Sequence, residues 1–446
     1  MHMGVLDRVI ARRLLALLLS AVAALAVWTR IQYIDLYGGR TDAYNAWADQ
    51  HYFGGLSVFY LSTSDELARG HSYTVLHHPP GYSYLLAALK VAGARSVGAI
   101  RIAQSAFDAA IVFVVYGLAR ALGVRPAGAV AAAGVYAVWP LFAIGATWPL
   151  AESLSPVLMA AILALLVGVR RSGRGVVTAG ACGFIIGLSA LVRPDFLLLI
   201  VPATVWILLP GVDRVREKTA ALLLAFAVPL FAWGIHNRVT NGVWVFGSTS
   251  SGLNFWEGLG EAPNSYGYVL DDSAANHVLM ARQLTWGSVD ADRYFRREYA
   301  HAWRNHPVFV LRVIAARIPR ILFESERLQP LFFGRARQLI DVAGLIFVIA
   351  AVWIHRRERA VWLLLVLPPL YAVGSIGLVH YEPRYVRYVQ LSYILAAVVL
   401  AEAAWRRLSR YSMRLTAATV WTLAAAAAAY TVRELHALHA VAMAAR

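Results

Sequence analysis

Long apolar stretches are the feature of this sequence that most limits its possible folds. A helix needs about 20 mostly apolar residues to cross the roughly 30 Å of hydrocarbon in a bilayer. The windows that approach this length are 14–34, 100–119, 127–146, 150–169, 175–192, 194–210, 219–236, 338–355, 360–379, 388–405 and 415–432. The composition agrees, because 59% hydrophobic and 15% charged residues make the chain more apolar than a soluble protein of 446 residues needs to be. The sequence therefore predicts an all-α, polytopic membrane protein with about 11 transmembrane helices, in a range of roughly 10 to 13.

Lysine and arginine residues in short loops indicate which side of the membrane each loop occupies, because they are retained on the cytoplasmic side. The stretch 82–94 decides the pattern, since it is short for a span and contains Lys90. If it does not cross, every short arginine-rich loop falls on one side. If it does cross, Arg8, Arg12 and Arg13 are separated from all the later clusters. The sequence therefore predicts that 82–94 is an external helix along the outer membrane face and that the N-terminus is cytoplasmic.

The formal net charge of +16 comes largely from these loops. Their later clusters are Arg120 and Arg125; Arg170, Arg171 and Arg174; Arg214, Arg216 and Lys218; Arg356, Arg357 and Arg359; and Arg406, Arg407, Arg410 and Arg414. No basic patch with interleaved aromatic residues occurs on a soluble domain, so nucleic acid is not expected as a partner. The expected surroundings are membrane lipids.

Two long polar segments remain outside the predicted spans, at about 35–99 and about 237–337. The second contains helix-like stretches around 291–304 and 306–323. The predicted organisation has three parts: a transmembrane module over 1–236 that includes external loop 35–99, an external loop with interfacial helices over 237–337, and C-terminal transmembrane helices over 338–446.

Ionisable residues at the outer ends of the predicted spans are the strongest functional signal. Asp42 follows the first span, Glu152 begins the fourth and Arg193 ends the fifth, while "HYEPRYVRY" joins the ninth and tenth spans. Charged groups near hydrocarbon are costly and are commonly functional or paired. In this interpretation they gather on one membrane face, and Asp108 is the only charged residue well inside a span.

Seven motifs then follow one another along the chain: "TDAYNAW", "HHPPGYSYLLA", "RIAQSAFDAAIVFVVYGLARALG", "WPLAESLSPVLMAAILAL", "GLSALVRPDFLLL", "WGIHNRVTNGVWVFGSTSSGLNFWEGLG" and "HYEPRYVRYVQLSY". In this order they resemble the GT-C superfamily of membrane glycosyltransferases, closest to the bacterial branch related to protein O-mannosyltransferases and lipid A aminoarabinose transferases. The resemblance implies a GT-C-like fold in the cytoplasmic (inner) membrane with the active site facing outward. It also implies transfer of a sugar, with inversion, from a polyprenyl-phosphate-linked donor to a lipid, glycan or protein acceptor.

The chemistry of such a transfer needs at least one arginine and one carboxylate. Negative charge develops on the departing phosphate, and a guanidinium fork can hold two of its oxygens. Arg384 is the expected phosphate ligand with Glu382 orienting it, and Arg193 is a second candidate. One alternative is a structural pair of Arg384 with Glu382, or an interfacial anchor formed with Tyr385. For Arg193 the alternative is a pair with Asp195.

An acceptor hydroxyl needs a base, and a carboxylate within hydrogen-bond reach can take its proton. Asp42 is the expected catalytic base, because the resemblance implies an acidic residue in the first external loop. The alternative is a helix N-cap before "AYNAWADQ". Many relatives have paired acidic residues where this sequence has "TDAY", so no cofactor is predicted and a divalent metal stays open as an alternative.

Supporting or acceptor-side roles are expected for a further group of residues. His78 is expected to shape the pocket for the sugar or the phosphate, against the alternative of a histidine in a turn. The others are Glu152, Tyr82, Asn254 and Glu257. A different class of function also fits the number of spans, namely a lipid or glycolipid transporter without transferase activity, which would place polar groups near the bilayer midplane.

Overall fold

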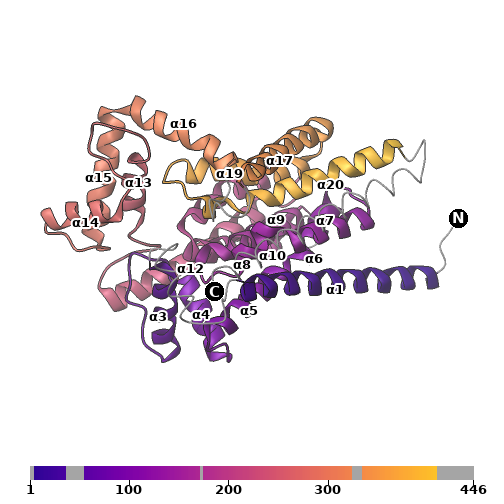
Figure 1. Ribbon diagram of the computed structural model, residues 1–446, viewed down its shortest axis with the longest axis horizontal. Coiled ribbons are helices and arrows are strands. Elements are labelled where there is room, and N and C mark those ends of the chain that lie inside the picture. Colours follow the sequence, from indigo (N-terminus) through magenta and orange to yellow (C-terminus); the bar gives the residue numbers. More distant parts are fainter. Residues whose placement is uncertain (1–4, 37–54, 171–173, 324–333, 409–446) are drawn as a thin grey trace.

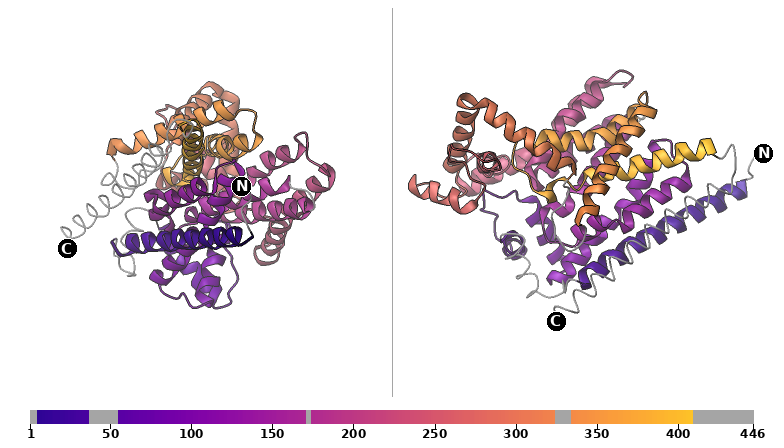
Figure 2. Two further views of the ribbon diagram at one scale, coloured as in Figure 1. Left: turned by 90° about the vertical axis from the view of Figure 1, so that its right-hand side faces the viewer. Right: turned by 45° about the horizontal axis from the view of Figure 1, so that its top comes forward.

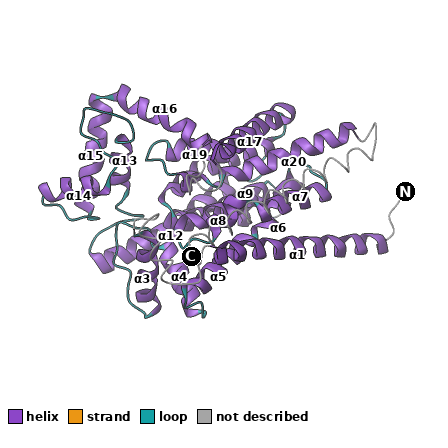
Figure 3. Cartoon of the chain, viewed as in Figure 1, coloured by secondary structure: helices purple, strands orange, loops and turns teal. Residues whose placement is uncertain are grey.

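The computed structural model describes residues 5–36, 55–170, 174–323 and 334–408, which form an all-α protein (Figure 1). Every regular element in these four stretches is a helix, and none of them contains a strand (Figure 3). The predicted fold class is therefore confirmed. The predicted window 415–432 and the proposed base Asp42 lie outside the described residues.

In the described part of the chain, seven helices are long and apolar enough to cross a membrane. They are α1 (Val5–Leu36), α5 with α6 (Val97–Ala109, Ile111–Ala121), η2 with α9 (Ala151–Leu154, Ser155–Val169), α10 (Gly175–Val192), α12 (Val215–Asn241), α18 with η4 and α19 (Arg359–Val361, Trp362–Val366, Leu367–Ile376), and α20 (Val389–Leu408). The bent pair α7 (Pro126–Val138) and α8 (Pro140–Ala146) is an eighth candidate. The structure thus has a helix of suitable length for most of the predicted spans.

Two predicted spans correspond to shorter apolar helices. Residues Pro194–Leu208 comprise η3 (Pro194–Leu199) and α11 (Ile200–Leu208), and Leu339–His355 is the larger part of α17 (Gly334–His355). Their positions match the predicted windows 194–210 and 338–355. Because these two helices are shorter, they are weaker candidates for crossing the membrane than the seven longer helices.

One proline causes the break between α7 and α8. Pro140 lacks a backbone N–H and disfavours the helical conformation at the residue before it. Trp139 is accordingly extended, with φ −66° and ψ 116°, and the two helices meet at 53°. The Trp139 indole donates a hydrogen bond of 2.5 Å to the Gln390 side chain on α20, which fixes the bend against that helix. The chain leaves α8 for the turn that contains Glu152.

The shorter helices from both long loops gather at one end of the molecule, opposite the N-terminus of α1 (Figures 1 and 2). From the first loop these are α3 (Leu56–Ala68) and α4 (Gly81–Val91). From the second loop they are α13 (Ser251–Leu259), α14 (Asp272–Ala281), α15 (Val289–Asn305) and α16 (Pro307–Phe323). The helix-like stretches read from the sequence around 291–304 and 306–323 are α15 and α16.

Helix α4 comprises most of residues 82–94, the stretch on which the predicted topology depends. It has 11 residues, which span about 16 Å at 1.5 Å per residue and fall well short of a bilayer. Its Lys90 is buried, donates to the Leu61 carbonyl oxygen at 2.7 Å and pairs with Asp65 at 2.6 Å, both on α3. The helix is therefore held against α3, which agrees with the prediction that 82–94 does not cross the membrane.

A buried ion pair joins three of the long helices. Arg30 on α1 and Asp108 on α5 are almost completely buried, and the guanidinium donates to the carboxylate at 2.7 Å and 2.5 Å. Arg30 also donates to the carbonyl oxygens of Ala26 and Ala137, and the Tyr136 hydroxyl on α7 donates to Asp108 at 2.8 Å. The expectation that Asp108 is the only charge well inside a span is therefore wrong, because Arg30 accompanies it.

Replacement of Tyr136 by phenylalanine should destabilise the protein by about 1–3 kcal/mol, since one oxygen of a buried carboxylate loses its donor. The measurement is thermal unfolding of the purified chain in a neutral detergent. Tyr116→Phe on α6 is the matched control, because the structure shows no hydrogen bond to the Tyr116 hydroxyl in the described residues. Equal effects of the two substitutions would contradict the structural role assigned to Tyr136.

Candidate active site

Three charged side chains that the sequence placed in separate motifs meet at the end of the bundle that carries the short helices. The Glu152 carboxylate lies 3.6 Å from an Arg193 nitrogen and 3.5 Å from Arg384 Nε. All three residues are at least nine-tenths buried. The sequence predicted that Glu152, Arg193 and Arg384 gather on one face, and in the structure Glu152 contacts both arginines. The catalytic and binding roles of these residues remain predictions.

Local backbone features place each of these residues. Arg193 follows α10 in an extended conformation, as expected for a residue before proline. Arg384 lies in η5 (Pro383–Val386), the short turn before α20. The turn before Glu152 is held by Gln104 on α5, whose amide donates to the carbonyl oxygens of Ala146 at 2.7 Å and Trp148 at 2.5 Å.

Each arginine has a second carboxylate partner. Arg193 donates to Asp195 at 2.9 Å, and Arg384 lies 2.7 Å from Glu382. The pairs that the sequence offered as structural alternatives therefore exist. In addition, Arg384 and then His380 hold the pKa of Glu382 below its usual value, although desolvation opposes ionisation of that carboxyl group. The charge on Glu382 is available to orient the Arg384 fork.

Tyr385 lies between the two arginines. Its ring centre is 4.4 Å from the Arg193 guanidinium carbon and 5.6 Å from that of Arg384. The Tyr385 hydroxyl also lies 3.3 Å from His380. A guanidinium on an aromatic face keeps its edge free to donate hydrogen bonds, so the ring can hold both cations in place without occupying their donors.

Four charged atoms in and beside this cluster have no hydrogen-bond partner in the described part of the chain. They are Glu152 Oε2, Arg193 Nη1, Arg384 Nε and Asp195 Oδ2, and all four atoms are buried. Buried charged atoms are normally satisfied, so such orphans point to a ligand or water in the functional protein. The Glu152 contacts of 3.5 and 3.6 Å are also longer than direct charged hydrogen bonds. Glu152 is therefore the least firmly held of the carboxylates around the two arginines.

The first external loop contributes an aromatic wall. His78 packs against Phe59, with 4.4 Å between ring centres, and lies 6.0 Å from Tyr60. Burial, and second the neighbouring His77, lower the pKa of His78 to about 3, so its imidazole is neutral. A neutral ring adds no positive charge for a phosphate. This fits the expected pocket-shaping role of His78 better than an electrostatic one.

Tyr60 and Tyr82 continue this wall toward Glu152. Their rings make an edge-to-face contact at 4.9 Å, and the Tyr82 hydroxyl donates to Gln104 at 2.6 Å. Burial, and second the Glu152 charge, raise the pKa of Tyr60, which keeps its hydroxyl protonated. Tyr82 supports the Glu152 turn through Gln104, which is the kind of supporting position expected for it.

The second external loop reaches the arginine pair through a contact that the sequence did not reveal. Buried Arg317 on α16 donates to Glu261 at 3.0 Å and to the carbonyl oxygens of Gly258 and Gly377. Glu261 in turn accepts from the Tyr381 N–H at 2.5 Å. The segment that follows α13 is therefore clamped to residues 377–381, directly before Glu382. In the sequence, the feature that could have indicated this contact is the presence of Arg317 within the apolar stretch "FVLRVIAARIPRIL".

The backbones on the two sides of this clamp touch. At Gly258 a Cβ atom would lie 1.8 Å from the Val379 carbonyl oxygen, so only glycine permits this approach. Asn254 and Glu257 occupy the same helix, α13. Asn254 is half-buried, while Glu257 is buried and its Oε1 has no partner in the described chain. Both lie on the loop assigned to the acceptor side, and their roles remain predictions.

Glu257 is the acidic residue with the most unusual environment. Burial, then the hydrogen-bonded Asp272 and the nearby Glu382, raise the pKa of Glu257 to about 9. The native state then holds one more proton than the unfolded state between about pH 4.5 and pH 9. Stability should therefore fall as the pH rises through this window, by up to about 1.4 kcal/mol per unit.

The expected result is a melting temperature that decreases from pH 5 to pH 9 in the wild-type protein and decreases less in Glu257→Gln. Thermal unfolding of both proteins across this range checks it. The same substitution at Glu298 on α15 is the control and should keep the wild-type pH dependence. A wild-type melting temperature that rises over the whole range would contradict a protonated Glu257.

The described residues do not fit a metal site. They contain no group of three or more His, Cys, Asp or Glu side chains that could hold an ion. Glu152, the carboxylate with an unpartnered oxygen, already faces two guanidinium groups, which repel a cation. No catalytic step is assigned to a metal here.

Comparison with known proteins agrees with this architecture. The resemblance to the GT-C glycosyltransferases that the sequence indicates is confirmed by the family model and by a solved structure. Residues 77–236 match the model of the dolichyl-phosphate-mannose-protein mannosyltransferase family. This segment contains the turn with His78, the Glu152 motif and Arg193. No curated protein matches the chain.

A solved structure of an archaeal oligosaccharyltransferase shares the fold. The Archaeoglobus fulgidus enzyme, crystallised with zinc and sulfate, aligns with a TM-score of 0.50 at 12% identity, over 93% of this chain and 53% of that chain. A structure of the enzyme with an inhibitory peptide and a dolichol-phosphate aligns with a TM-score of 0.47 at 10% identity, over 94% of this chain and 56% of that chain. The chain thus spans about half the length of these proteins, 53% and 56%.

Proposed function

We propose that this protein is a membrane glycosyltransferase that moves a sugar from a polyprenyl-phosphate-linked donor to an acceptor hydroxyl on the outer side of the cytoplasmic membrane. The observation that carries the proposal is the meeting of Arg193 and Arg384 around a loosely held Glu152, at the end of the bundle where both external loops pack. Two guanidinium groups can together bind a phosphate group, and the Glu152 carboxylate between them has an oxygen without a hydrogen-bond partner.

The positive charge of the site is balanced before the donor binds. Arg193 and Arg384 face Glu152, Asp195 and Glu382, so a phosphate must take the place of a carboxylate. Glu152 is the carboxylate to be displaced, because its contacts are the longest and one of its oxygens has no partner. The donor phosphate then bridges the two arginines, with Glu382 and Asp195 still orienting them.

In the proposed reaction the acceptor oxygen attacks the anomeric carbon and forms the new glycosidic bond. The bond from that carbon to the phosphate oxygen breaks, and polyprenyl phosphate leaves with the electron pair. The two arginines stabilise the charge that develops on the leaving phosphate. Asp42 takes the acceptor proton. Attack opposite the leaving group gives inversion at the anomeric carbon.

Asp42 lies outside the described residues, so its assignment rests on its place in the sequence. It follows Leu36, the last residue of α1, by six positions. Helix α1 packs against α8, which leads directly into the Glu152 turn.

A transporter remains the alternative class, and the buried charges inside the bundle bear on it. A transport site places exchangeable polar groups near the bilayer midplane. Arg30 and Asp108 instead bind each other, two backbone carbonyl oxygens and Tyr136. These mutual contacts support a structural role for the pair and favour the transferase.

The experiment that tests the proposal uses the purified full-length chain with a panel of polyprenyl-phosphate sugars and membrane lipid, glycan and peptide acceptors. Mass spectrometry follows the release of polyprenyl phosphate and the glycosylated product. Release that depends on both donor and acceptor supports the transferase. Movement of intact donor across a vesicle membrane without release would overturn it in favour of the transporter.

A further inference from the structure

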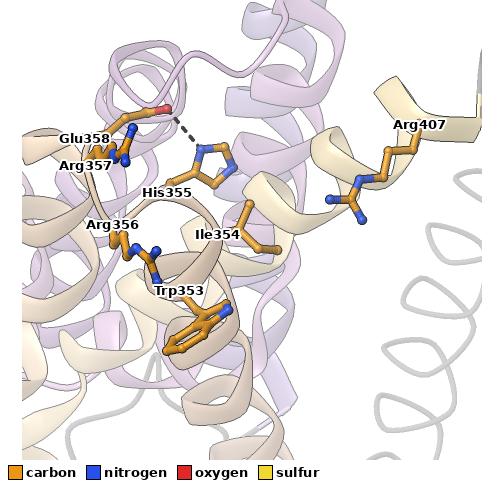
Figure 4. A pocket seen from close by; sticks show the side chains of 7 residues that line it. All are labelled: Trp353, Ile354, His355, Arg356, Arg357, Glu358 and Arg407. Atoms are coloured by element: carbon orange, nitrogen blue, oxygen red, sulfur yellow. Dashed lines mark hydrogen bonds and ion pairs between the residues drawn. The ribbon is translucent and has the colours of Figure 1, made fainter.

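A pocket of about 570 Å³ lies at the opposite end of the molecule from the candidate active site (Figure 4). Arg384 precedes α20, whereas Arg407 lies near its last residue, so the two ends are separated by about 30 Å of helix. The pocket is lined by the end of α17, the turn that follows it and the end of α20: Trp353, Ile354, His355, Arg356, Arg357, Glu358 and Arg407.

The arginines of this pocket lack a carboxylate partner in the described part of the chain. No ion pair engages Arg356, Arg357 or Arg407 within the four described stretches, and all three side chains are exposed. Neighbouring arginines differ, because Arg406 pairs with Glu402 at 3.0 Å and donates to the Gly123 carbonyl oxygen. The pocket therefore has cationic donors that point to an anionic ligand.

The acidic residue in the pocket lining does not cancel this charge. Glu358 lies 3.0 Å from His355, and Figure 4 shows its carboxylate directed at that imidazole. Arg407 approaches from the other side of the pocket, on α20. The two helix ends thus present arginines from different elements to one space, with a surplus of positive charge.

Apolar side chains lie directly beside these cations. Trp353 is 73% exposed and Ile354 is 47% exposed, and the Arg356 guanidinium carbon lies 5.2 Å from the Trp353 ring centre. Tryptophan favours the boundary between lipid tails and headgroups. A free phosphate would need the arginines alone, whereas an exposed indole and an aliphatic side chain provide a surface for the upper part of acyl chains.

We propose that this pocket binds the phosphate group of an acidic phospholipid, with Arg356, Arg357 and Arg407 around the headgroup and the acyl chains against Trp353 and Ile354. Basic pockets between helix ends can hold such headgroups, and each arginine near an anionic surface contributes about 1 kcal/mol. The site is separate from the proposed transferase site and does not depend on its chemistry.

The test measures lipid binding by native mass spectrometry of the full-length chain in detergent, titrated with dioleoylphosphatidylglycerol or dioleoylphosphatidylcholine. The wild-type protein should retain phosphatidylglycerol in preference to phosphatidylcholine. The double variant Arg356→Gln/Arg407→Gln should bind phosphatidylglycerol about 10- to 30-fold more weakly. The matched control Arg12→Gln/Arg13→Gln removes two exposed arginines from the N-terminal part of α1 and should bind as the wild type does.

Several outcomes separate this site from simpler explanations. Equal weakening in the control would overturn the proposal, because overall charge would then explain binding. Displacement of phosphatidylglycerol by millimolar inorganic phosphate alone would overturn the lipid as the ligand and identify a free-phosphate site. Should the glutamine variant unfold in detergent, Arg356→Lys/Arg407→Lys keeps the charge but loses the forked donors. That variant should retain the preference for phosphatidylglycerol with reduced affinity, and unchanged affinity would contradict a direct guanidinium contact.

Discussion

Replacement of Asp42 by asparagine should reduce sugar transfer by about 10²–10⁴-fold, with little change in the affinity for the donor. Asparagine keeps the shape and most of the hydrogen bonding of aspartate, so the variant loses only the ability to accept a proton. The measurement pairs donor affinity with the rate of polyprenyl-phosphate release, both on folded, monodisperse protein. This combination of near-normal binding and slow transfer is the signature of a lost base.

The other roles of Asp42 give different results in the same experiment. Asparagine caps helices nearly as well as aspartate, so a capping residue would give almost normal transfer. A substrate ligand in a transporter would instead lose donor binding. Asp49→Asn makes the same change in the same segment and should transfer sugar at nearly the wild-type rate. Normal transfer by Asp42→Asn would move the base to Glu152 or Glu382.

Replacement of Arg384 by alanine should decrease the transfer rate by about 10²–10³-fold, because one of two cations that stabilise the leaving phosphate is lost. Donor affinity should fall as well, since Glu152 and Glu382 would then face a single arginine. Steady-state transfer and equilibrium donor binding measure the two effects. Unchanged donor binding in this variant would remove Arg384 from the phosphate site.

Lysine at the same position separates charge from geometry. Arg384→Lys keeps the positive charge but cannot hold two phosphate oxygens in a planar fork, so donor affinity should fall by about 1–3 kcal/mol. Arg238→Lys is the control, because Arg238 is exposed at the end of α12 and has no part in the cluster. A loss of the same size in both variants would indicate a general effect of replacing arginine by lysine at this end of the protein, and not the loss of a fork at the phosphate.

Helices were the part of the structure that the sequence could predict. Their apolar windows and the helix-like stretches of the second long loop depend on local composition. The break at Pro140, inside the single predicted window 127–146, was not predicted. The prediction that 82–94 lies outside the membrane also rests on a local signal, the arginines in short loops. Local signals of this kind need no knowledge of which helices become neighbours.

Contacts between distant residues were not predictable in the same way. Asp108 was visible, but its partner Arg30 is 78 positions away and resembled an ordinary residue at a span end. Arg317 and Glu261 are 56 positions apart, and nothing near either residue identifies the other. Glu152 was expected in a supporting or acceptor-side role, and its position between two arginines from other elements was not predicted. These pairings depend on tertiary packing, which a single sequence does not display.

The glycine contact beneath the Arg317 clamp limits how α13 can move. Because the Gly258 and Val379 backbones leave no space between them, α13 cannot approach the 377–381 segment further, and the clamp prevents it from moving away. A ligand that displaces α13 must therefore shift the turn that carries Arg384. In the proposed transferase, movement of α13 and the position of Arg384 would thus be linked mechanically.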